Sequence, residues 1–181
     1  MKLTGTLAKL GTAFQLAYME ADFDEALSRW NALGVGPFYR MGLIFDDIEF
    51  QGRMTELDID IAFSHWGDIQ IEIIRQNNDD QPSIYLDWQT SKNRAIHHIG
   101  VMVDDIAAAR AQLEATGYEI VFHKKMQGQG EFMYGKSPHA PGLIELAKLA
   151  PPATAAMARL RSECAKWDGT RPLREFSELV G

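Results

Sequence analysis

The sequence predicts an α+β fold made of two tandem β-α-β-β-β modules, followed by a C-terminal helical extension. Two observations predict it: one stretch of the chain recurs after 83 residues, and three strand-like segments follow that stretch in each half. The chain has 181 residues, of which 46% are hydrophobic and 24% charged. Such a chain is globular and long enough to bury a core.

The recurring stretch reads as a strand, an aspartate, a helix and a glycine. It is FQLAYMEADFDEALSRWNALG at 14–34 and HHIGVMVDDIAAARAQLEATG at 97–117. The identical positions, five of 21, are Met19 and Met102, Asp22 and Asp105, Ala26 and Ala109, Ala32 and Ala115, Gly34 and Gly117. Most of them lie at positions with separate physical roles, which strengthens the repeat.

The shared aspartates and glycines predict where the two helices begin and end. Asp22 and Asp105 are N-cap candidates, whose side chains accept bonds from free backbone N–H groups. Glu25 follows Asp22 at the spacing of a capping box. Gly34 and Gly117 stand where a helix would end in a left-handed turn.

After each helix, β-branched and aromatic residues alternate with polar ones, or run together, as in strands. The predicted strands are 37–45, 50–63 and 68–75 in the first half, and 118–125, 131–136 and 142–149 in the second. The last strands match at an offset of 73, so the first half carries ten more residues between its helix and its last strand. We expect a longer hairpin around DDIEF, 46–50, to contain them.

These patterns predict one domain and a tail. The expected boundaries are a domain at 1–149 with modules at about 10–76 and 94–149, a polar, turn-rich linker at 77–93, and a helical tail at 150–181. Residues 154–167 have the pattern of an amphipathic helix. The tail could cover a sheet edge, close a pocket or build a dimer.

Composition excludes several function classes. The net charge of −7 argues against sequence-independent nucleic-acid binding, which needs a basic surface. Cys164 is the single cysteine, so neither an internal disulfide nor a cysteine-based zinc knuckle is expected. The first residues lack the apolar core of a secretion signal, and no stretch approaches membrane-spanning length. We therefore expect a cytoplasmic protein without a nucleic-acid or membrane partner.

The repeat aligns four polar residues within strand-like runs. Gln15 stands opposite His98 on the first strand of each half, and Glu72 stands opposite Glu145 on the last. Successive side chains of a strand face opposite sides, so each of these faces water or a cavity. Related by pseudo-two-fold symmetry, the four could converge on one point.

Two motifs carry a resemblance to a known family. HHIGVMVDDI (97–106) and GLIEL (142–146), together with the paired modules, resemble the vicinal oxygen chelate superfamily over about residues 10–149. That group includes glyoxalase I, methylmalonyl-CoA epimerase, extradiol dioxygenases and bleomycin-resistance proteins, and the first two are the nearest branches. The resemblance implies a curved, half-barrel mixed sheet and a homodimer.

The resemblance also implies a metal site. Carried over residue by residue, the ligands of one divalent ion are Gln15, Glu72, His98 and Glu145. A set of N and O ligands without thiolate suits Zn, Ni, Co, Mn or Fe. His97, one pleat away, is expected to face the helix layer or solvent.

Such a site predicts an enzyme that chelates two neighbouring oxygens of a small substrate. The ion would acidify the C–H next to a carbonyl, and Glu145 or Glu72 would move the proton. The predicted reaction is that of a lyase, isomerase or epimerase of the glyoxalase type.

Two alternatives stay open. Extradiol dioxygenases of this superfamily hold Fe(II) with two histidines and one glutamate, whereas Gln15 stands here where a second histidine is wanted. A metal-free binding or resistance protein is the other alternative. Candidates for an apolar pocket wall are Phe38, Tyr39, Trp66, Phe132 and Tyr134, and candidates for contact with an anionic group are Arg40, Lys124, Lys125 and Lys136.

Overall fold

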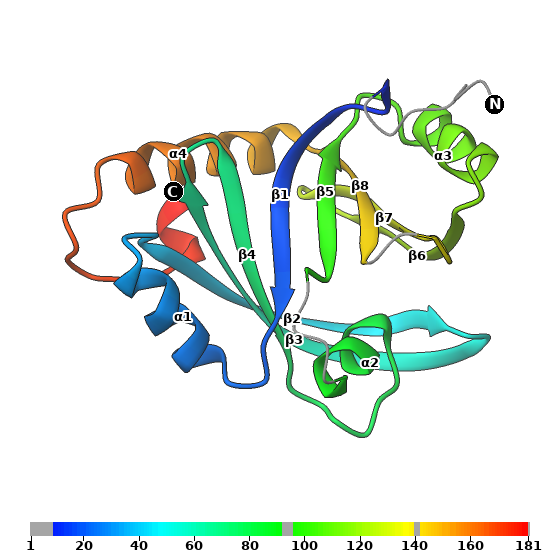
Figure 1. Cartoon of the computed structure of the whole chain (residues 1–181), viewed down its shortest axis with the longest axis horizontal. Helices are drawn as coiled ribbons and strands as arrows, with labels where there is room; N and C mark the ends of the chain where they lie inside the picture. The colour runs from blue at the N-terminus through cyan, green and yellow to red at the C-terminus, as the bar shows by residue number, and fades with distance from the viewer. Residues whose placement is uncertain (1–8, 92–95, 140–141, 181) are drawn as a thin grey trace.

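A single curled sheet of nine strands organises the chain (Figure 1). The structure is a computed structural model that describes residues 9–91, 96–139 and 142–180. The first eight residues, the end of the predicted linker at 92–93 and the start of the second module at 94–95 lie outside the described residues. No helix within these described ranges is long and apolar enough to cross a membrane.

Both halves contain the predicted strand-helix-strand-strand-strand succession. The first half contains β1 (Thr12–Met19), α1 (Phe23–Ala32), β2 (Phe38–Phe50), β3 (Arg53–Trp66) and β4 (Ile69–Gln76). The second half contains β5 (His98–Met102), α3 (Ile106–Ala115), β6 (Glu119–Met126), β7 (Gly130–Lys136) and β8 (Leu143–Leu149). The extra residues of the first half lengthen the β2–β3 hairpin, as predicted.

The strand order confirms the duplication. It runs β6-β7-β8-β5-β1-β4-β3-β2-β9, so each module has its first strand at the centre and its last strand beside it. β1 and β4 are parallel, as are β5 and β8. The modules join within the chain where β1 and β5 pair antiparallel, with Ala17 opposite His98. This is the predicted curved, half-barrel mixed sheet.

Aspartate caps start both module helices. Asp22 accepts a hydrogen bond from the N–H of Glu25 at 2.9 Å, and Asp105 accepts one from the N–H of Ala108 at 3.0 Å. The Glu25 carboxylate forms an ion pair with Arg29 at 2.9 Å rather than completing the capping box.

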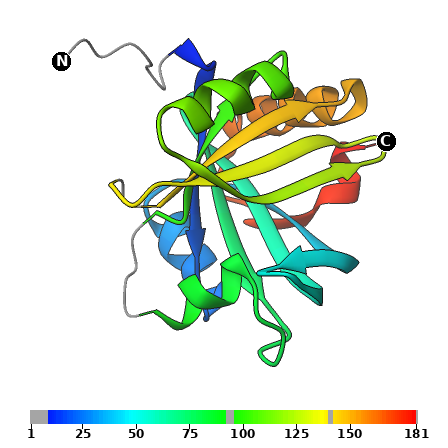
Figure 2. The same cartoon turned by 90° about the vertical axis from the view of Figure 1, so that its right-hand side faces the viewer.

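Strand alternation gives the sheet two different faces. On β4, Ile71 and Ile73 pack against α1 on the outer face, whereas Gln70 and Glu72 point into the curl. α3 covers the outer face of the second module through Ile106, Ala109 and Leu113. Figure 2 shows the two modules curling round a common interior.

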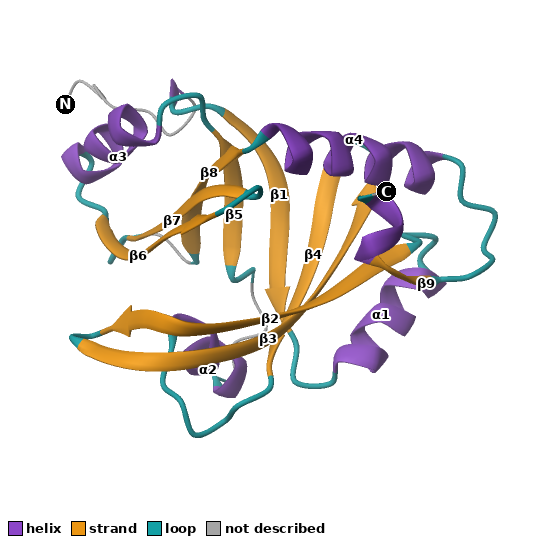
Figure 3. Ribbon diagram, turned by 180° about the vertical axis from the view of Figure 1, so that it is seen from behind, coloured by secondary structure: helices purple, strands orange, loops and turns teal. Residues whose placement is uncertain are grey.

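The tail returns to the sheet. α4 (Pro151–Ala165) begins earlier than the predicted 154–167 helix and packs on β3 and on the interior cluster through Ala156 and Leu160. β9 (Leu173–Glu175) adds a parallel strand beside β2, and η2 (Phe176–Leu179) follows it (Figure 3). The tail thus covers one sheet edge, one of the three roles considered for it.

The predicted linker contains a helix. α2 (Ile84–Thr90) begins after Ser83, whose hydroxyl accepts from the N–H groups of Tyr85 and Leu86 at 3.0 and 3.1 Å. Because this segment is short and polar at both ends, its sequence pattern indicated turns. The helix places Tyr85 against the interior of the sheet.

Candidate functional site

Four neighbouring strands each carry one of the four aligned polar residues. Gln15 lies on β1, Glu72 on β4, His98 on β5 and Glu145 on β8, which are the central strands in the order β8-β5-β1-β4. None of the four residues is more than 6% exposed. The pleat therefore places one amide, one imidazole and two carboxylates together on the inner face of the sheet.

The three oxygen-bearing side chains converge on His98. Its Nε2 atom lies 3.0 Å from Oε1 of Gln15, 3.2 Å from Oε2 of Glu72 and 3.7 Å from Oε2 of Glu145. Gln15 and Glu72 come from the first module, and His98 and Glu145 come from the second. The convergence that the repeat suggested is therefore present in the structure.

Gly100 makes room for this arrangement. It pairs with Gln15 across β1 and β5, and a Cβ at Gly100 would lie 2.8 Å from Oε1 of Gln15 and 2.9 Å from its Cβ. Any side chain there would displace the Gln15 amide. The glycine of the HHIG motif thus has a steric role at the site.

A chain of donors fixes the orientation of the Gln15 amide. Its Nε2 donates to Oε1 of Gln70 at 2.6 Å, and Nε2 of Gln70 in turn donates to Sδ of Met157 at 3.1 Å. Since the amide nitrogen of Gln15 is engaged, its carbonyl oxygen faces His98. Met157 belongs to α4, so the tail contributes to this orientation.

His97 fixes the ring of His98. Nε2 of His97 lies 3.3 Å from the carbonyl oxygen of Ile84, which can only accept, so this nitrogen carries a proton. Burial holds the pKa of His97 well below its usual value, so the ring is neutral and its Nδ1 is an acceptor. Nδ1 of His98, 2.9 Å away, must donate to it. A neutral His98 therefore presents the Nε2 lone pair to the three oxygens.

His97 is fully buried and packs against α2 rather than against α1 or α3 on the outer face, and its ring also contacts those of His98 and Tyr134. Its ring stacks on Tyr85, with centroids 5.2 Å apart, and meets the edge of Trp88 at 5.4 Å. Its contact with Ile84 also lies at the start of α2. The missed helix thus supports the histidine that orients His98.

Burial dominates the electrostatics of the two carboxyl groups. It raises the pKa of Glu72 to about 8. It also raises the pKa of Glu145, to about 7, where the nearby Glu72 charge adds to the effect while His98 and a hydrogen bond from Tyr134 oppose it. The same burial lowers the pKa of His98, against the attraction of Glu145. A positive charge among these groups would favour the ionised form of both glutamates.

The donor set fits a divalent ion in chemistry. A lone pair and three acceptor oxygens around one point repel one another unless a proton or a cation lies between them. Ligands roughly 2.0–2.2 Å from an ion and at right angles are about 3 Å apart, close to the 3.0 and 3.2 Å found for Gln15 and Glu72. Glu145 is more distant, and among the described residues no three His, Cys, Asp or Glu side chains form a ready-made metal cage.

The structure adds residues to the site that sequence patterns did not indicate. Gln70 and Tyr85 line the same cavity as the two glutamates, and the Tyr85 hydroxyl donates to that of Tyr134 at 3.2 Å. Their partners are distant in sequence, so only the fold reveals them. Of the five aromatic residues proposed for a pocket wall, Phe132 and Tyr134 line the cavity.

The other three aromatic residues lie elsewhere. Phe38 packs in the outer cluster beneath α1, because it points to the opposite face of β2 from the cavity. Tyr39 is buried and bonded to Arg174, and Trp66 is 65% exposed at the end of β3. Of the four candidate cations, Lys124 lines the cavity and forms an ion pair with Asp47.

Comparison with known families agrees with this architecture. Residues 14–134 match the model of the glyoxalase/bleomycin resistance protein/dioxygenase superfamily. The chain belongs to this superfamily. The match includes Gln15, Glu72 and His98 and ends before Glu145 and the tail. No curated protein matches the sequence.

Several solved structures share the fold. Methylmalonyl-CoA epimerase from Mycobacterium tuberculosis is 22% identical with a TM-score of 0.60, over 86% of this chain and 97% of the epimerase. A Streptomyces coelicolor methylmalonyl-CoA epimerase variant in complex with 2-nitronate-propionyl-CoA is 14% identical with a TM-score of 0.52, over 78% and 96%. A mutant 4-hydroxymandelate synthase from Streptomyces coelicolor is 13% identical with a TM-score of 0.55, over 81% of this chain and 51% of the synthase.

Proposed function

We propose that the protein is a divalent-metal-dependent enzyme that moves a proton next to a carbonyl group, as a lyase, isomerase or epimerase. The observation that carries the proposal is the convergence of Gln15, Glu72 and Glu145 on the Nε2 lone pair of His98. Gln15, Glu72, His98 and Glu145 would hold the ion, which is Zn, Ni, Co, Mn or Fe. The shared fold of methylmalonyl-CoA epimerases, which handle such a carbonyl compound, supports this class.

The side chains account for the proton transfer. A bound ion would supply Lewis acidity that stabilises an enediolate. Two carboxylates balance its charge, while the Gln15 carbonyl and the His98 imidazole add neutral ligands. With these four residues as ligands, the ion would still have room for two neighbouring oxygens of the substrate.

Glu145 is the better placed of the two predicted bases. Its carboxylate is 3.7 Å from His98 Nε2, against 3.2 Å for Glu72, so it is held less closely at the point of convergence. It lines the cavity and accepts a hydrogen bond from Tyr134. We assign proton transfer to Glu145, which would detach from the ion to act as the base, while Glu72 would stay bound. The Tyr134 hydroxyl would hold the detached carboxylate by its hydrogen bond.

The extradiol dioxygenase alternative receives less support. That chemistry uses two histidines and one glutamate around iron. His97 is turned away, with Nδ1 bonded to His98 and Nε2 to the Ile84 carbonyl. One imidazole and two carboxylates therefore face the point of convergence. A homodimer stays a prediction, which light scattering of the protein in solution tests.

The proposal is tested by metal content and proton exchange measured together. Wild type, Glu145→Gln and the control Glu131→Gln, whose side chain pairs with His123 at the surface of β7, are loaded with each ion and dialysed. We expect about one ion per chain in wild type and control, and weaker retention in Glu145→Gln. Exchange of the C–H next to a ketone into D2O, followed by NMR, should require the ion and Glu145. Wild-type protein that retains none of the five ions contradicts the proposal.

A further inference from the structure

An apolar cavity of about 330 Å³ extends from the candidate metal centre. Gln15, Gln70, Glu72 and Glu145 line its polar end. Its walls are mostly hydrophobic, and they include Met41, Leu43, Phe45, Phe63, Phe122 and Phe132. An apolar cavity of about 150 Å³ holds benzene, so this one has room for a hydrocarbon group about twice that size.

The tail closes one side of this cavity. Pro152, Ala153, Ala156 and Met157 of α4 line it, and so do Phe176 and Val180 beyond β9. All six are apolar. They also lie beyond β8, the last strand of the second module, so this wall comes from the C-terminal tail.

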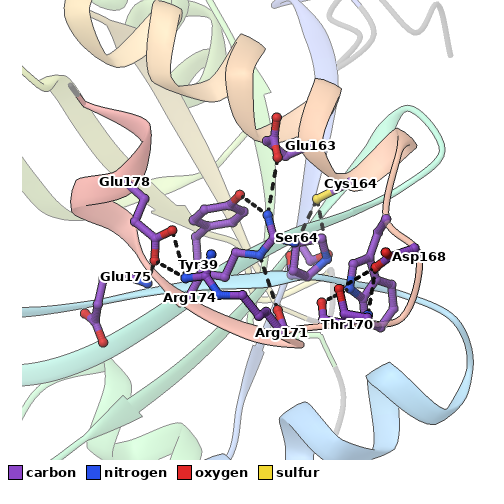
Figure 4. A network of polar contacts seen from close by, with 12 residues as sticks. Tyr39, Ser64, Glu163, Cys164, Asp168, Thr170, Arg171, Arg174, Glu175 and Glu178 are labelled. Atoms are coloured by element: carbon purple, nitrogen blue, oxygen red, sulfur yellow. Dashed lines mark hydrogen bonds and ion pairs between the residues drawn. The ribbon is translucent and has the colours of Figure 1, made fainter.

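Several contacts fix the tail to the sheet (Figure 4). Nη1 of Arg174 donates to the hydroxyl of Tyr39 at 2.9 Å and pairs with Glu163 of α4 at 3.3 Å. The thiol of Cys164 donates to the carbonyl oxygen of Pro37 at 3.6 Å. These bonds, with the β2–β9 pairing, connect the C-terminal end of α4 and the strand β9 to the first module. The wall is therefore an ordered part of the cavity.

We propose that the substrate carries an extended hydrocarbon group of up to about twelve carbons beside its chelating oxygens, and that the C-terminal tail sets the length of that group. The inference rests on the proposed function, since the metal centre would hold the oxygens. Burying the group in this cavity supplies affinity, because each methylene removed from water contributes about fourfold in the binding constant. Ala153 and Phe176 are the length-setting residues that substitution can test.

The test is a chain-length series. Straight-chain 2-oxo acids from pyruvate to 2-oxohexadecanoate, whose hydrocarbon groups extend past the proposed limit, are titrated by calorimetry into protein loaded with Zn²⁺. We expect about fourfold tighter binding per methylene, until the cavity is full and the affinity levels off. In parallel, saturated fatty acids of the same lengths displace the dye 1-anilinonaphthalene-8-sulfonate from metal-free protein in EDTA.

Variants of the tail shift the length at which the affinity levels off. Because Ala153→Phe fills part of the cavity, its affinity should level off at a chain at least two carbons shorter than in wild type. It should bind the longest acids at least tenfold more weakly, whereas its affinity for pyruvate should change less than twofold. Phe176→Ala enlarges the cavity, so its affinity should level off at a longer chain than in wild type. Ala158→Phe, on the exposed side of α4, is the matched control and should behave as wild type.

The two arms separate this inference from the proposed function. Zn²⁺ binding with no effect of chain length overturns the inference and leaves the function standing. Chain-length dependence and the Ala153→Phe shift in EDTA, without metal binding, support the inference and contradict the function. Tail variants that level off at the wild-type length, while circular dichroism shows them folded, also overturn it.

Discussion

The Nδ1 atoms of His97 and His98 lie 2.9 Å apart, and the backbone carbonyl of Ile84 determines which of them donates. Because that carbonyl takes the Nε2 proton of His97, His98 donates from Nδ1 and keeps Nε2 free. Residues that orient a ligand in this way change metal affinity by about 10–100-fold when replaced.

His97→Phe should weaken metal binding by about that factor, since Phe cannot accept from His98. His97→Gln should recover part of the affinity, because its amide can accept from His98 and donate to Ile84. The measurement is a competition titration with a chromophoric chelator. His123→Phe, at an exposed site on β6, is the control. Equal affinities for wild type and His97→Phe would show that the ring of His98 orients itself.

The stability of the metal-free protein should fall as pH rises. In the folded state burial raises the pKa of Glu72 to about 8 and of Glu145 to about 7, so the folded state holds more protons than the unfolded state above pH ~4.5. The pKa values of His97 and His98 are lowered in the folded state, so these two residues make stability rise with pH up to about pH 6.5. The decline should therefore be clearest between pH 6.5 and 8.

Urea unfolding in EDTA across that range measures this decline. In Glu72→Gln/Glu145→Gln the free energy of unfolding should change little between the two pH values, and at pH 8 it should exceed that of wild type. A wild-type protein that becomes more stable from pH 6.5 to 8 would contradict the assignment of buried, protonated carboxyl groups.

Metal affinity should rise over the same pH range. Protons and the ion compete for Glu72 and Glu145, so loss of two protons on binding gives up to about a hundredfold gain per pH unit. The gain should diminish near pH 8, where both groups ionise without help. Isothermal titration in buffers of different ionisation enthalpy counts the released protons. The Glu145→Gln variant should release one proton fewer on binding the ion. A metal affinity that does not change with pH would exclude these carboxyl groups as ligands.

Gly100→Ala should affect the site more than the fold. Its Cβ would lie 2.8 Å from Oε1 of Gln15, so the amide must move away from His98. We expect a stability loss of about 1–3 kcal/mol and at least a tenfold loss of metal affinity. Gly42→Ala is the matched control, because its nearest contact, Oδ1 of Asp60, would be 3.7 Å away. Unchanged metal affinity in Gly100→Ala would mean that Gln15 is no ligand.

The sequence predicted what local chemistry determines. The caps at Asp22 and Asp105 formed, and directly after the C-caps of these helices Gly34 and Gly117 turn the chain with φ of +83° and +89°. Strand periodicity then placed Gln15, Glu72, His98 and Glu145 on one face, because alternation needs no knowledge of distant contacts. Their roles as ligands and bases stay predictions.

What the sequence did not predict depends on tertiary contacts. Seven residues of α2 are too few to form a stable helix alone, and packing of Tyr85 and Trp88 on His97 supports them. The three-residue strand β9 exists because β2 offers a free edge. The bond from Gln70 to Met157 joins residues 87 positions apart, which no local pattern can indicate.

The seam between β1 and β5 has a further consequence. Gln15 and Glu72 lie on one side of it, and His98 and Glu145 lie on the other. An ion held by all four would therefore link the two halves of the chain. Opening either half would release the ion. Amide hydrogen exchange should therefore slow on both sides of the seam together when metal is added, although the two halves are separate in sequence.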